Sequence, residues 1–393
     1  MRLDHLRIPG EDGAKDIRIA NGKIISVLPA GAPPPGEASE PTLSFDGALV
    51  FPGLINSHDH LDFNLFPPLG NRIYRNYTEW GRDIHANNPV TIQAVQKVPQ
   101  ALRTQWGIYK NLLNGFTTVV NHGERLATDN SLINVFQEYY CLHSVGFERN
   151  WKWKLNKPLA ASMPFVLHVG EGTDAAAGRE IDRLIRWNFR RRPLVGIHGV
   201  AMNERQAAHF RALVWCPASN YFLLDRTAPI DRLKQKVPVV FGTDSTLTAS
   251  WNSWSQIRMG RTSQLASDRE LLDMLTTTPA AIWGFTDRGT LAAGRVADLV
   301  IARPKPTGLQ RLYPGDALDS FFALDPEDLL LVMHEGNIRL FDPCLRTSLI
   351  TAGLIKGEFD QTHPGGKYVA GDLPGLMQEI RRYYPAVQFP LMP

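Results

Sequence analysis

Apolar and polar residues alternate at both ends of the chain, and this alternation predicts β-strands. Residues 16–20 and 23–28 alternate around an Asn-Gly dipeptide, which is typical of a two-residue hairpin turn. A second hairpin is indicated late in the chain, where residues 329–333 and 338–341 flank a short polar turn. We therefore expect both chain ends to form β-structure.

Between these ends, short apolar runs alternate with segments of helical periodicity. The apolar runs, which predict buried strands, are residues 48–55, 116–121, 139–145, 164–169, 194–198, 213–216 and 237–242. The helical segments are residues 91–114, 131–138, 175–190 and 270–285. Strands that alternate with helices are typical of parallel βα units. The pattern predicts an α/β fold: a (β/α)8-type TIM barrel with a small β-sandwich built from both chain ends.

The predicted barrel lacks room for one strand. Only 18 residues separate Val145 from Pro164, which is too few for two more helices and a strand. We therefore expect an irregular or seven-stranded barrel at this point. The predicted domains are a β-sandwich from residues 1–50 and 289–345, a catalytic barrel from residues 51–288, and a C-terminal extension from residues 346–393.

Composition narrows the class of protein. Apolar residues make up 44% and charged residues 21%, which excludes a disordered or fibrous chain, and the net charge of +3 gives no reason to expect nucleic acid or membrane as a partner. No apolar run approaches the roughly 18 residues of a membrane span. The three cysteines form no CxxC pair, so neither a disulfide framework nor a cysteine zinc site is expected. These features indicate a cytoplasmic protein with a small-molecule substrate.

Ligand-type residues stand at the ends of the predicted barrel strands. His58 and His60 end the first strand, and a strand's period of two places them on one side with Asp59 facing away. His168, His198 and Asp244 end three later strands. In a barrel these carboxyl ends meet on one face, where active sites lie. Imidazoles and a carboxylate gathered there predict a metal site.

Several motifs together resemble the amidohydrolase superfamily. They are FPGLINSHDH, HVGE, GIHG, CPASN and FGTDS, and they occur in the family's order, followed by GTLAAGRVADLVIARP, which resembles the stretch where the family's chain re-enters its β-sandwich. The resemblance is greatest to the branch that holds cytosine deaminase, guanine deaminase, S-adenosylhomocysteine deaminase and the triazine chlorohydrolases. It covers about residues 16–304.

The resemblance implies one divalent metal, zinc with iron or manganese as alternatives. It implies the ligands His58, His60, His168 and Asp244. It gives His198 the role of steadying the attacking hydroxide, Asp244 that of a further proton acceptor, and Glu171 that of carrying a proton to the substrate. The carboxylated lysine of two-metal members has no counterpart on a predicted strand, which favours one metal.

The motifs indicate the residues that contact the substrate less clearly than they indicate the metal ligands. The candidates are Trp80, His122, Arg125, Arg149, Asn220 and Ser245. The stretch 149–154 is basic and aromatic, and with Arg125 it suggests a binding site for an anionic group of the substrate. The alternative is a solvated basic loop. Trp151 and Trp153 either wall the pocket or pack elsewhere.

The expected reaction is hydrolysis at an amidine-type carbon, often in a nitrogen heterocycle, with release of ammonia or an amine. Hydrolysis of a cyclic amide and removal of a halide are alternatives on the same site. A third alternative is a barrel without catalysis that serves as a binding module. The complete set of candidate ligands argues against the third. The sequence leaves the substrate and a homo-oligomeric state open.

Overall fold

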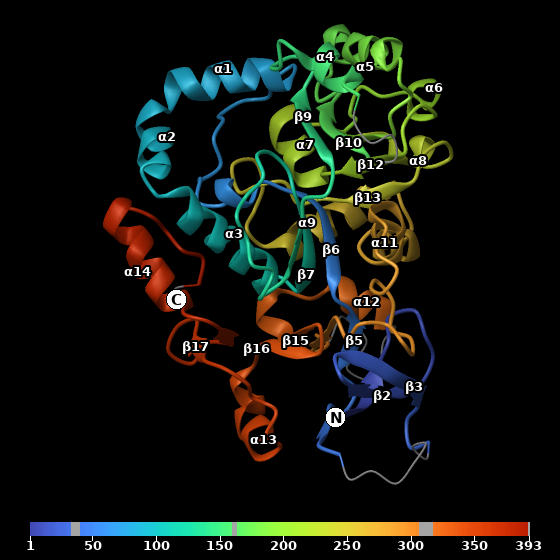
Figure 1. Ribbon diagram of the computed structural model, residues 1–393, viewed down its shortest axis with the longest axis vertical. Helices are drawn as coiled ribbons and strands as arrows, with labels where there is room; N and C mark the ends of the chain where they lie inside the picture. Colours follow the sequence, from blue (N-terminus) through green and yellow to red (C-terminus); the bar gives the residue numbers. More distant parts are fainter. Residues whose placement is uncertain (33–39, 159–162, 306–316, 392–393) are drawn as a thin grey trace.

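The computed structural model describes residues 1–32, 40–158, 163–305 and 317–391. Strands from both chain ends lie together in its lower part in Figure 1, and the alternating strands and helices of the middle of the chain lie above them. Within the described ranges, no helix combines the length and the apolar character that crossing a membrane requires.

The middle of the chain has a TIM-barrel-like α/β architecture built on parallel strands in two open sheets. The first sheet holds β6 (Leu54–Asp59), β7 (Phe116–Asn121) and β8 (Asn134–Phe136). The second holds β9 (Tyr140–Ser144), β10 (Phe165–Val169), β11 (Leu194–His198), β12 (Ala212–Trp215) and β13 (Val239–Phe241). Both sheets contain consecutive strands paired in parallel, so their carboxyl ends point the same way.

The two sheets meet where β13 lies beside β6. No strand ladder joins them among the described residues, but the carbonyl oxygen of His58 accepts hydrogen bonds from the backbone N–H groups of Thr243 and Asp244, at 3.1 and 3.0 Å. Gly242 permits this approach, because a Cβ there would lie 2.8 Å from the Cβ of His58. The barrel-like arrangement is therefore interrupted between β13 and β6, a place for which the sequence predicted no irregularity.

Residues 131–138 form no helix, and that prediction is wrong. Residues 134–136 are instead strand β8, which pairs with β7 and brings the parallel strands to eight, so the count of seven is also wrong. The turn before β8 is held by Asn130, whose side-chain oxygen accepts from the N–H of Val135 at 3.0 Å. The gap after Val145 holds a short helix, α4 (Trp151–Asn156), while residues 159–162 lie outside the described ranges.

The predicted first barrel strand, residues 48–55, is divided between two sheets. β5 (Leu49–Pro52) belongs to the sheet of the chain ends, and β6 begins two residues later. Gly53 makes the passage, since a Cβ there would lie 2.2 Å from the hydroxyl oxygen of Thr117. The sheet of the chain ends is thus joined through Gly53 to the first parallel sheet, at the strand that leads to His58 and His60.

The chain ends share one ten-stranded sheet. Its order is β17-β18-β16-β15-β14-β5-β1-β2-β3, with β4 beside β1. The early strands are β1 (Arg2–Arg7), β2 (Ala14–Ala20), β3 (Lys23–Pro29) and β4 (Thr42–Ser44). The late strands are β14 (Leu299–Ala302), β15 (Leu329–His334), β16 (Asn337–Phe341), β17 (Phe359–Gln361) and β18 (Tyr368–Ala370). Antiparallel pairing of β5 with β14 joins the two ends. A two-layer sandwich is not established by this pairing.

Helices connect the parallel strands and also occur in the segment between β6 and α3 and in the C-terminal part of the chain. The first are α1 (Tyr77–Asn87), α2 (Pro89–Gln96), α3 (Gln100–Leu113), α5 (Ala175–Trp187), α6 (Glu204–Ala207), α7 (Pro217–Leu224) and α8 (Ile230–Leu233). The later ones are α9 (Ser253–Thr262), α10 (Asp268–Asp273), α11 (Thr277–Trp283), α12 (Ala317–Phe322), α13 (Arg346–Thr351) and α14 (Leu373–Tyr383). Pro99 separates α2 from α3, so the predicted helix over residues 91–114 is two helices.

The C-terminal extension lies against the barrel. Helix α14 packs on α3, and the ring of Phe389 lies 4.7 Å from that of Trp106. The hydroxyl of Tyr109 on α3 donates to the carbonyl oxygen of Ala370 at 3.0 Å. The extension, to which the motifs assign no role, thus packs against α3, the helix that precedes β7.

Candidate active site

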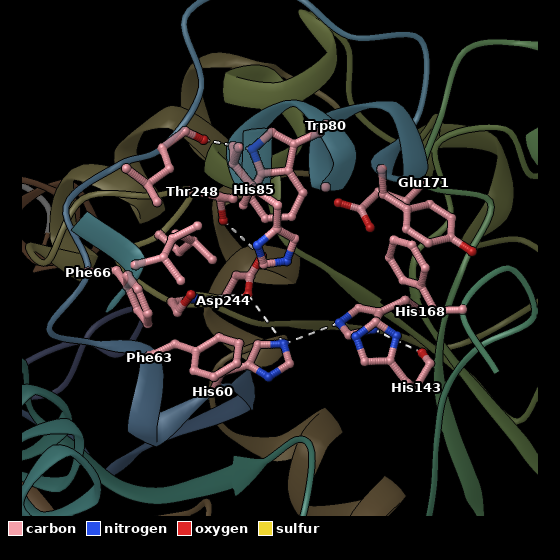
Figure 2. Close-up of a pocket in the computed structure, with 18 of the residues that line it drawn as sticks. His60, Phe63, Phe66, Trp80, His85, His143, His168, Glu171, Asp244 and Thr248 are labelled. Atoms are coloured by element: carbon pink, nitrogen blue, oxygen red, sulfur yellow. Dashed lines mark hydrogen bonds and ion pairs between the residues drawn. The ribbon is translucent and has the colours of Figure 1, made fainter. Parts of the chain in front are cut away.

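The four predicted metal ligands converge at the carboxyl ends of the strands. The Nε2 atoms of His60 and His168 are 3.3 Å apart, and Oδ1 of Asp244 lies 3.6 Å from Nε2 of His58 and 3.8 Å from Nε2 of His60. Figure 2 shows His60 between Asp244 and His168, with dashed lines to both. All four side chains are buried.

The donor set fits a divalent metal. The Nε2 atom of His58 is buried and has no hydrogen-bond partner, a costly state for a polar atom. It faces the other imidazole nitrogens and a carboxylate oxygen at distances that one ion could bridge. Three neutral imidazoles and one carboxylate are ligands of a kind that zinc prefers, and they leave a position for water.

Neighbouring groups orient these ligands. The Nδ1–H of His168 donates to the carbonyl oxygen of His143 at 3.0 Å, because a carbonyl only accepts, and this leaves Nε2 of His168 with its lone pair toward the cluster. Oδ2 of Asp244 accepts from the hydroxyls of Ser219 at 2.7 Å and Thr248 at 3.0 Å. These contacts leave Oδ1 of Asp244 facing the histidines.

Glu171 and His198 lie beside the cluster. Oε2 of Glu171 is 3.6 Å from Nε2 of His198, and both residues are buried. Burial, reinforced by the charge of Asp244, raises the pKa of Glu171 well above its usual value. Burial lowers the pKa of His198 to about 4, so its imidazole is neutral at pH 7. A carboxyl with a raised pKa is suited to giving and taking protons near neutral pH.

Two of these residues have unusual backbone geometry. His198 has a φ of +72° and Asp244 a φ of +54°, in the left-handed region that residues with a Cβ rarely adopt. Nδ1 of His198 donates to Oδ1 of Asn220 at 2.8 Å, which fixes the imidazole despite this backbone. Such strained positions cluster at functional sites, where the surrounding structure holds them.

A cavity of about 770 Å³ opens above the cluster, and His60, His168, Glu171, His198 and Asp244 form its floor. Its walls are largely apolar. The apolar wall residues are Phe63, Phe66, Leu69, Tyr77, Trp80, Ile84, Ile92, Phe147 and Leu247. Many of them belong to residues 61–98, which connect β6 to α3 and which we call the cap segment. The cavity thus combines a polar floor with walls that are rich in apolar side chains (Figure 2).

Comparison with known proteins gives consistent matches. The model of the amidohydrolase family matches residues 159–338. A 5-methylthioadenosine/S-adenosylhomocysteine deaminase from Desulforudis audaxviator is 24% identical, over 75% of this chain and 82% of its own length. Both matches agree with the resemblance of the motifs to the amidohydrolase superfamily.

Solved structures of two deaminases and a chlorohydrolase share its fold. An adenosine deaminase from Xanthomonas campestris with bound zinc has a TM-score of 0.61 at 17% identity, with 98% of each chain covered. Guanine deaminase from C. acetobutylicum has a TM-score of 0.59 at 16% identity and covers 86% of this chain and 99% of its own. Atrazine chlorohydrolase from Arthrobacter aurescens with zinc has a TM-score of 0.61 at 16% identity and covers 90% and 99%. At these identities the structural likeness concerns the fold.

The structure brings only some of the expected substrate contacts to the cavity. Trp80 and Ser245 line the cavity, and the indole N–H of Trp80 donates to the carbonyl oxygen of Leu69 at 2.7 Å. His122 and Asn220 are buried behind the floor. The ring of His122 lies 4.5 Å from that of His168, and Asn220 binds His198. His122 therefore packs against a candidate ligand and Asn220 orients His198, and neither lines the cavity.

Arg125 and Arg149, the expected contacts to an anionic group of the substrate, do not line the cavity. Arg125 is on the surface, where its guanidinium binds the carboxylate of Glu138 at 2.7 Å. Arg149 is exposed in the turn before α4. Trp151 is buried in the core and Trp153 is 64% exposed, so neither walls the cavity. A solvated basic loop, the alternative reading of this stretch, agrees with these positions.

Sequence reasoning missed His143, which lines the cavity and whose carbonyl oxygen fixes the ring of His168. Burial lowers the pKa of His143. The residue stands near the carboxyl end of β9, so the strand-end rule that found His168 applied to it as well. His85 and Arg82 of the cap segment also line the cavity, and no motif pointed to them.

A buried carboxyl behind the cavity predicts a pH effect on stability. The hydroxyl of Tyr77 donates to Oε1 of Glu180 at 2.8 Å, and burial raises the pKa of Glu180 in the folded protein. A carboxyl whose folded pKa exceeds its unfolded value stabilises the fold at low pH, and this stability is lost as the pH rises through the folded pKa. Glu180→Gln, which keeps the acceptor for Tyr77, is therefore expected to raise the Tm at about pH 8 and to change it little near the unfolded pKa of about 4.3.

Calorimetry of both proteins across this pH range measures the effect. The exposed Glu327 provides the matched control, because Glu327→Gln should leave the Tm unchanged at every pH. A Tm difference for Glu180→Gln that is the same at both ends of the range would contradict the expectation.

Proposed function

We propose that this protein is a metal-dependent hydrolase that attacks the carbon of an amidine-type or cyclic C–N bond, as a deaminase of a substituted nitrogen heterocycle. The observation that supports this best is the meeting of three imidazoles, one carboxylate and the Glu171–His198 pair at the floor of one cavity. The relative and the structural neighbours include proteins named as deaminases of adenosine-type compounds and of guanine.

The proposed chemistry divides the work among the floor residues. His58, His60, His168 and Asp244 would hold one divalent ion, which supplies an activated water near neutral pH when bound. His198, kept neutral by burial and oriented by Asn220, would direct that water to the substrate carbon. Glu171 would deliver a proton to a substrate nitrogen and then to the leaving amine, which its raised pKa favours.

The test combines metal analysis with product detection. We expect purified protein to hold about one divalent ion per chain and to release ammonia from at least one member of a panel of amino-substituted heterocycles. Release of chloride from a chlorinated panel instead would identify the dehalogenating alternative, to which the atrazine chlorohydrolase neighbour draws attention. Bound metal without turnover on either panel would favour a binding barrel, and absence of metal would contradict the proposal.

The cavity suggests a substrate with an apolar substituent. Its volume of about 770 Å³ far exceeds that of a single heterocycle, and its walls carry aromatic and aliphatic side chains. On a deaminated heterocycle, lengthening an N-alkyl substituent from methyl to propyl should lower KM about fourfold per methylene at unchanged kcat, since burying one CH2 is worth about 0.8 kcal/mol. Trp80→Ala should reduce this gain. A KM independent of chain length would contradict the apolar substituent.

From the sequence we also propose that the resident metal is zinc and that the protein is a cytoplasmic homo-oligomer. We propose no nucleic acid or membrane partner. The division into residues 51–288 as catalytic barrel, residues 1–50 with 289–345 as β-sandwich, and residues 346–393 as extension belongs with these proposals. Joining of the chain ends through β5 and β14 supports this division.

A further inference from the structure

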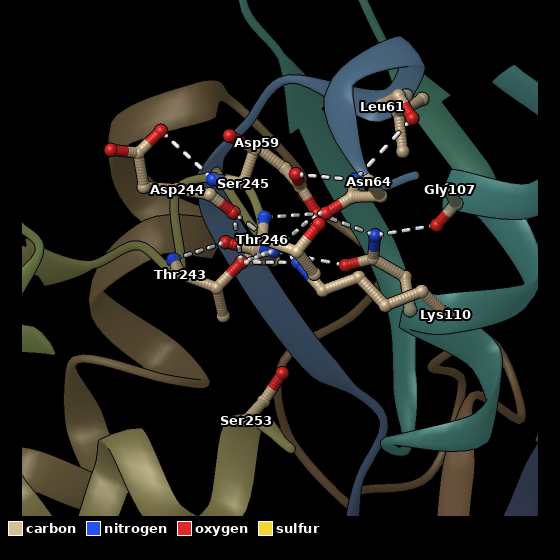
Figure 3. Close-up of polar contacts among 12 residues, drawn as sticks. Asp59, Leu61, Asn64, Gly107, Lys110, Thr243, Asp244, Ser245, Thr246 and Ser253 are labelled. Atoms are coloured by element: carbon tan, nitrogen blue, oxygen red, sulfur yellow. Dashed lines mark hydrogen bonds and ion pairs between the residues drawn. The ribbon is translucent and has the colours of Figure 1, made fainter. Parts of the chain in front are cut away.

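A lysine ammonium group is buried directly beneath the candidate metal cluster. Lys110 lies on α3 and is 1% exposed. Its Nζ donates to Oδ2 of Asp59 at 3.1 Å, to the hydroxyl oxygen of Thr243 at 3.3 Å and to the carbonyl oxygen of Asp244 at 3.2 Å (Figure 3). All three protons of the ammonium group are thus used. The catalytic scheme above leaves this residue without a role.

Asp59, the acidic partner, stands between two candidate ligands in the sequence. It is fully buried and faces away from the cluster, opposite to His58 and His60. Its Oδ2 also accepts from the side chain of Asn111 at 2.8 Å, and its Oδ1 from that of Asn64 at 2.9 Å. Any shift of Asp59 would displace the histidines on either side of it.

The other two acceptors of Lys110 stand at the start of the Asp244 loop. Thr243 donates its hydroxyl to the same carbonyl oxygen of Asp244, at 3.0 Å. Asp244 holds the left-handed backbone described above, and its carbonyl must point toward Lys110 for this contact. Lys110 therefore contacts both the strand that carries two histidines and the loop that carries the carboxylate ligand.

This contact bridges the place where the two open sheets meet. There β6 and β13 share no ladder, and the described backbone link is the pair of bonds to the carbonyl of His58. Asn56 supplements it, since its side-chain oxygen accepts from the N–H of Thr243 at 3.1 Å and its amide donates to the hydroxyl of that residue at 2.7 Å. A buried charge pair is costly unless its geometry is fully satisfied, as it is here.

We propose that Lys110 is a positioning residue that sets the distance between Asp244 and the His58–His60 pair, and thereby the affinity of the site for a divalent metal. The inference rests on the ligand set of the proposed function. Removal of a group that hydrogen-bonds to a metal ligand and orients it typically lowers metal affinity about 10–100-fold.

The test measures zinc affinity by chelator competition and the Tm of the metal-free protein, neither of which needs a substrate. In Lys110→Met we expect the Kd for zinc to rise at least about tenfold and the Tm to fall, because Asp59 keeps an unpaired buried charge. Lys97, exposed after α2, provides the matched control, and Lys97→Met should change neither quantity. If wild-type protein binds no zinc, the proposed function fails, whereas an unchanged Kd in folded Lys110→Met overturns this inference alone.

A double variant separates positioning from plain stability. Asp59→Asn with Lys110→Met removes both buried charges, so the Tm should recover toward that of wild type. If Lys110 positions Asp244, the Kd for zinc stays at least about tenfold weaker in the double variant. Joint recovery of Tm and Kd would overturn the proposal. If Lys110→Met does not fold, Thr243→Val replaces it, because this variant removes one acceptor of Lys110. We expect Thr243→Val to weaken zinc binding, and an unchanged Kd would overturn the proposal.

Discussion

Glu171→Gln is expected to lower kcat by about 10²-fold or more while the protein keeps about one metal ion per chain. The amide has nearly the shape of the carboxyl and retains an oxygen toward His198, but it cannot give up and regain a proton. Glu171 is buried beside the cluster with a raised pKa and is not among the groups of side chains that could share an ion, so coordination should survive. Steady-state kinetics together with elemental analysis measure both quantities on one sample.

His198→Asn provides a second variant with the same expected pattern. His198 forms a group of potential metal ligands with His58 and Asp244, but its Nδ1 is held by Asn220 and its Nε2 faces Glu171. If it steadies the attacking water, as the resemblance implies, its loss should reduce turnover with less effect on binding of the metal. If either variant instead loses its metal, that residue is a ligand and the proposed division of roles must be revised. If Glu171→Gln retains wild-type turnover, another group carries the proton.

His168→Ala is expected to lose most of its bound metal and therefore most of its activity relative to wild type. Its Nε2 lies 3.3 Å from that of His60, and its Nδ1 is anchored on the carbonyl of His143, so alanine removes a preoriented ligand. A zinc site with one ligand fewer loses affinity and no longer lowers the pKa of water in the same way. Elemental analysis after dialysis gives the metal content directly.

His85 offers the matched control for this experiment. It lines the same cavity from the cap segment, and no group of potential metal ligands among the described residues includes it. His85→Ala should therefore retain the metal. Full metal content in His168→Ala, with the control unchanged, would contradict the ligand assignment and the mechanism that depends on it.

The convergence of the candidate metal ligands could be predicted from the sequence because their placement follows from local rules. A strand's period of two places His58 and His60 on one side, and parallel strands bring the ends of β6, β10 and β13 to one face. The substrate contacts could not be predicted in this way. They depend on how the cap segment folds over the strands, and loop residues such as Arg125 find partners on the surface that no periodicity reveals.

Two other features escaped prediction for different physical reasons. Residues 134–136 are a strand of only three residues, too short to show a period, and tertiary pairing with β7 decides their conformation. Lys110 lies on a helix face that periodicity assigns to the core, where a charge is expected only with a partner. That partner, Asp59, is 51 positions away in the chain.

The cap segment has a consequence for how the specificity of such a protein can change. It is one continuous stretch between β6 and α3, it supplies much of the cavity wall, and it contributes none of the four candidate metal ligands. It is also attached to the loop that holds Glu171, because Asn76 pairs with Gly172 and the N–H of Tyr77 donates to the carbonyl oxygen of Glu171 at 3.0 Å. Exchange of the cap segment between relatives would change the cavity wall and leave the candidate metal ligands unchanged, provided that the contacts of residues 76–77 are kept.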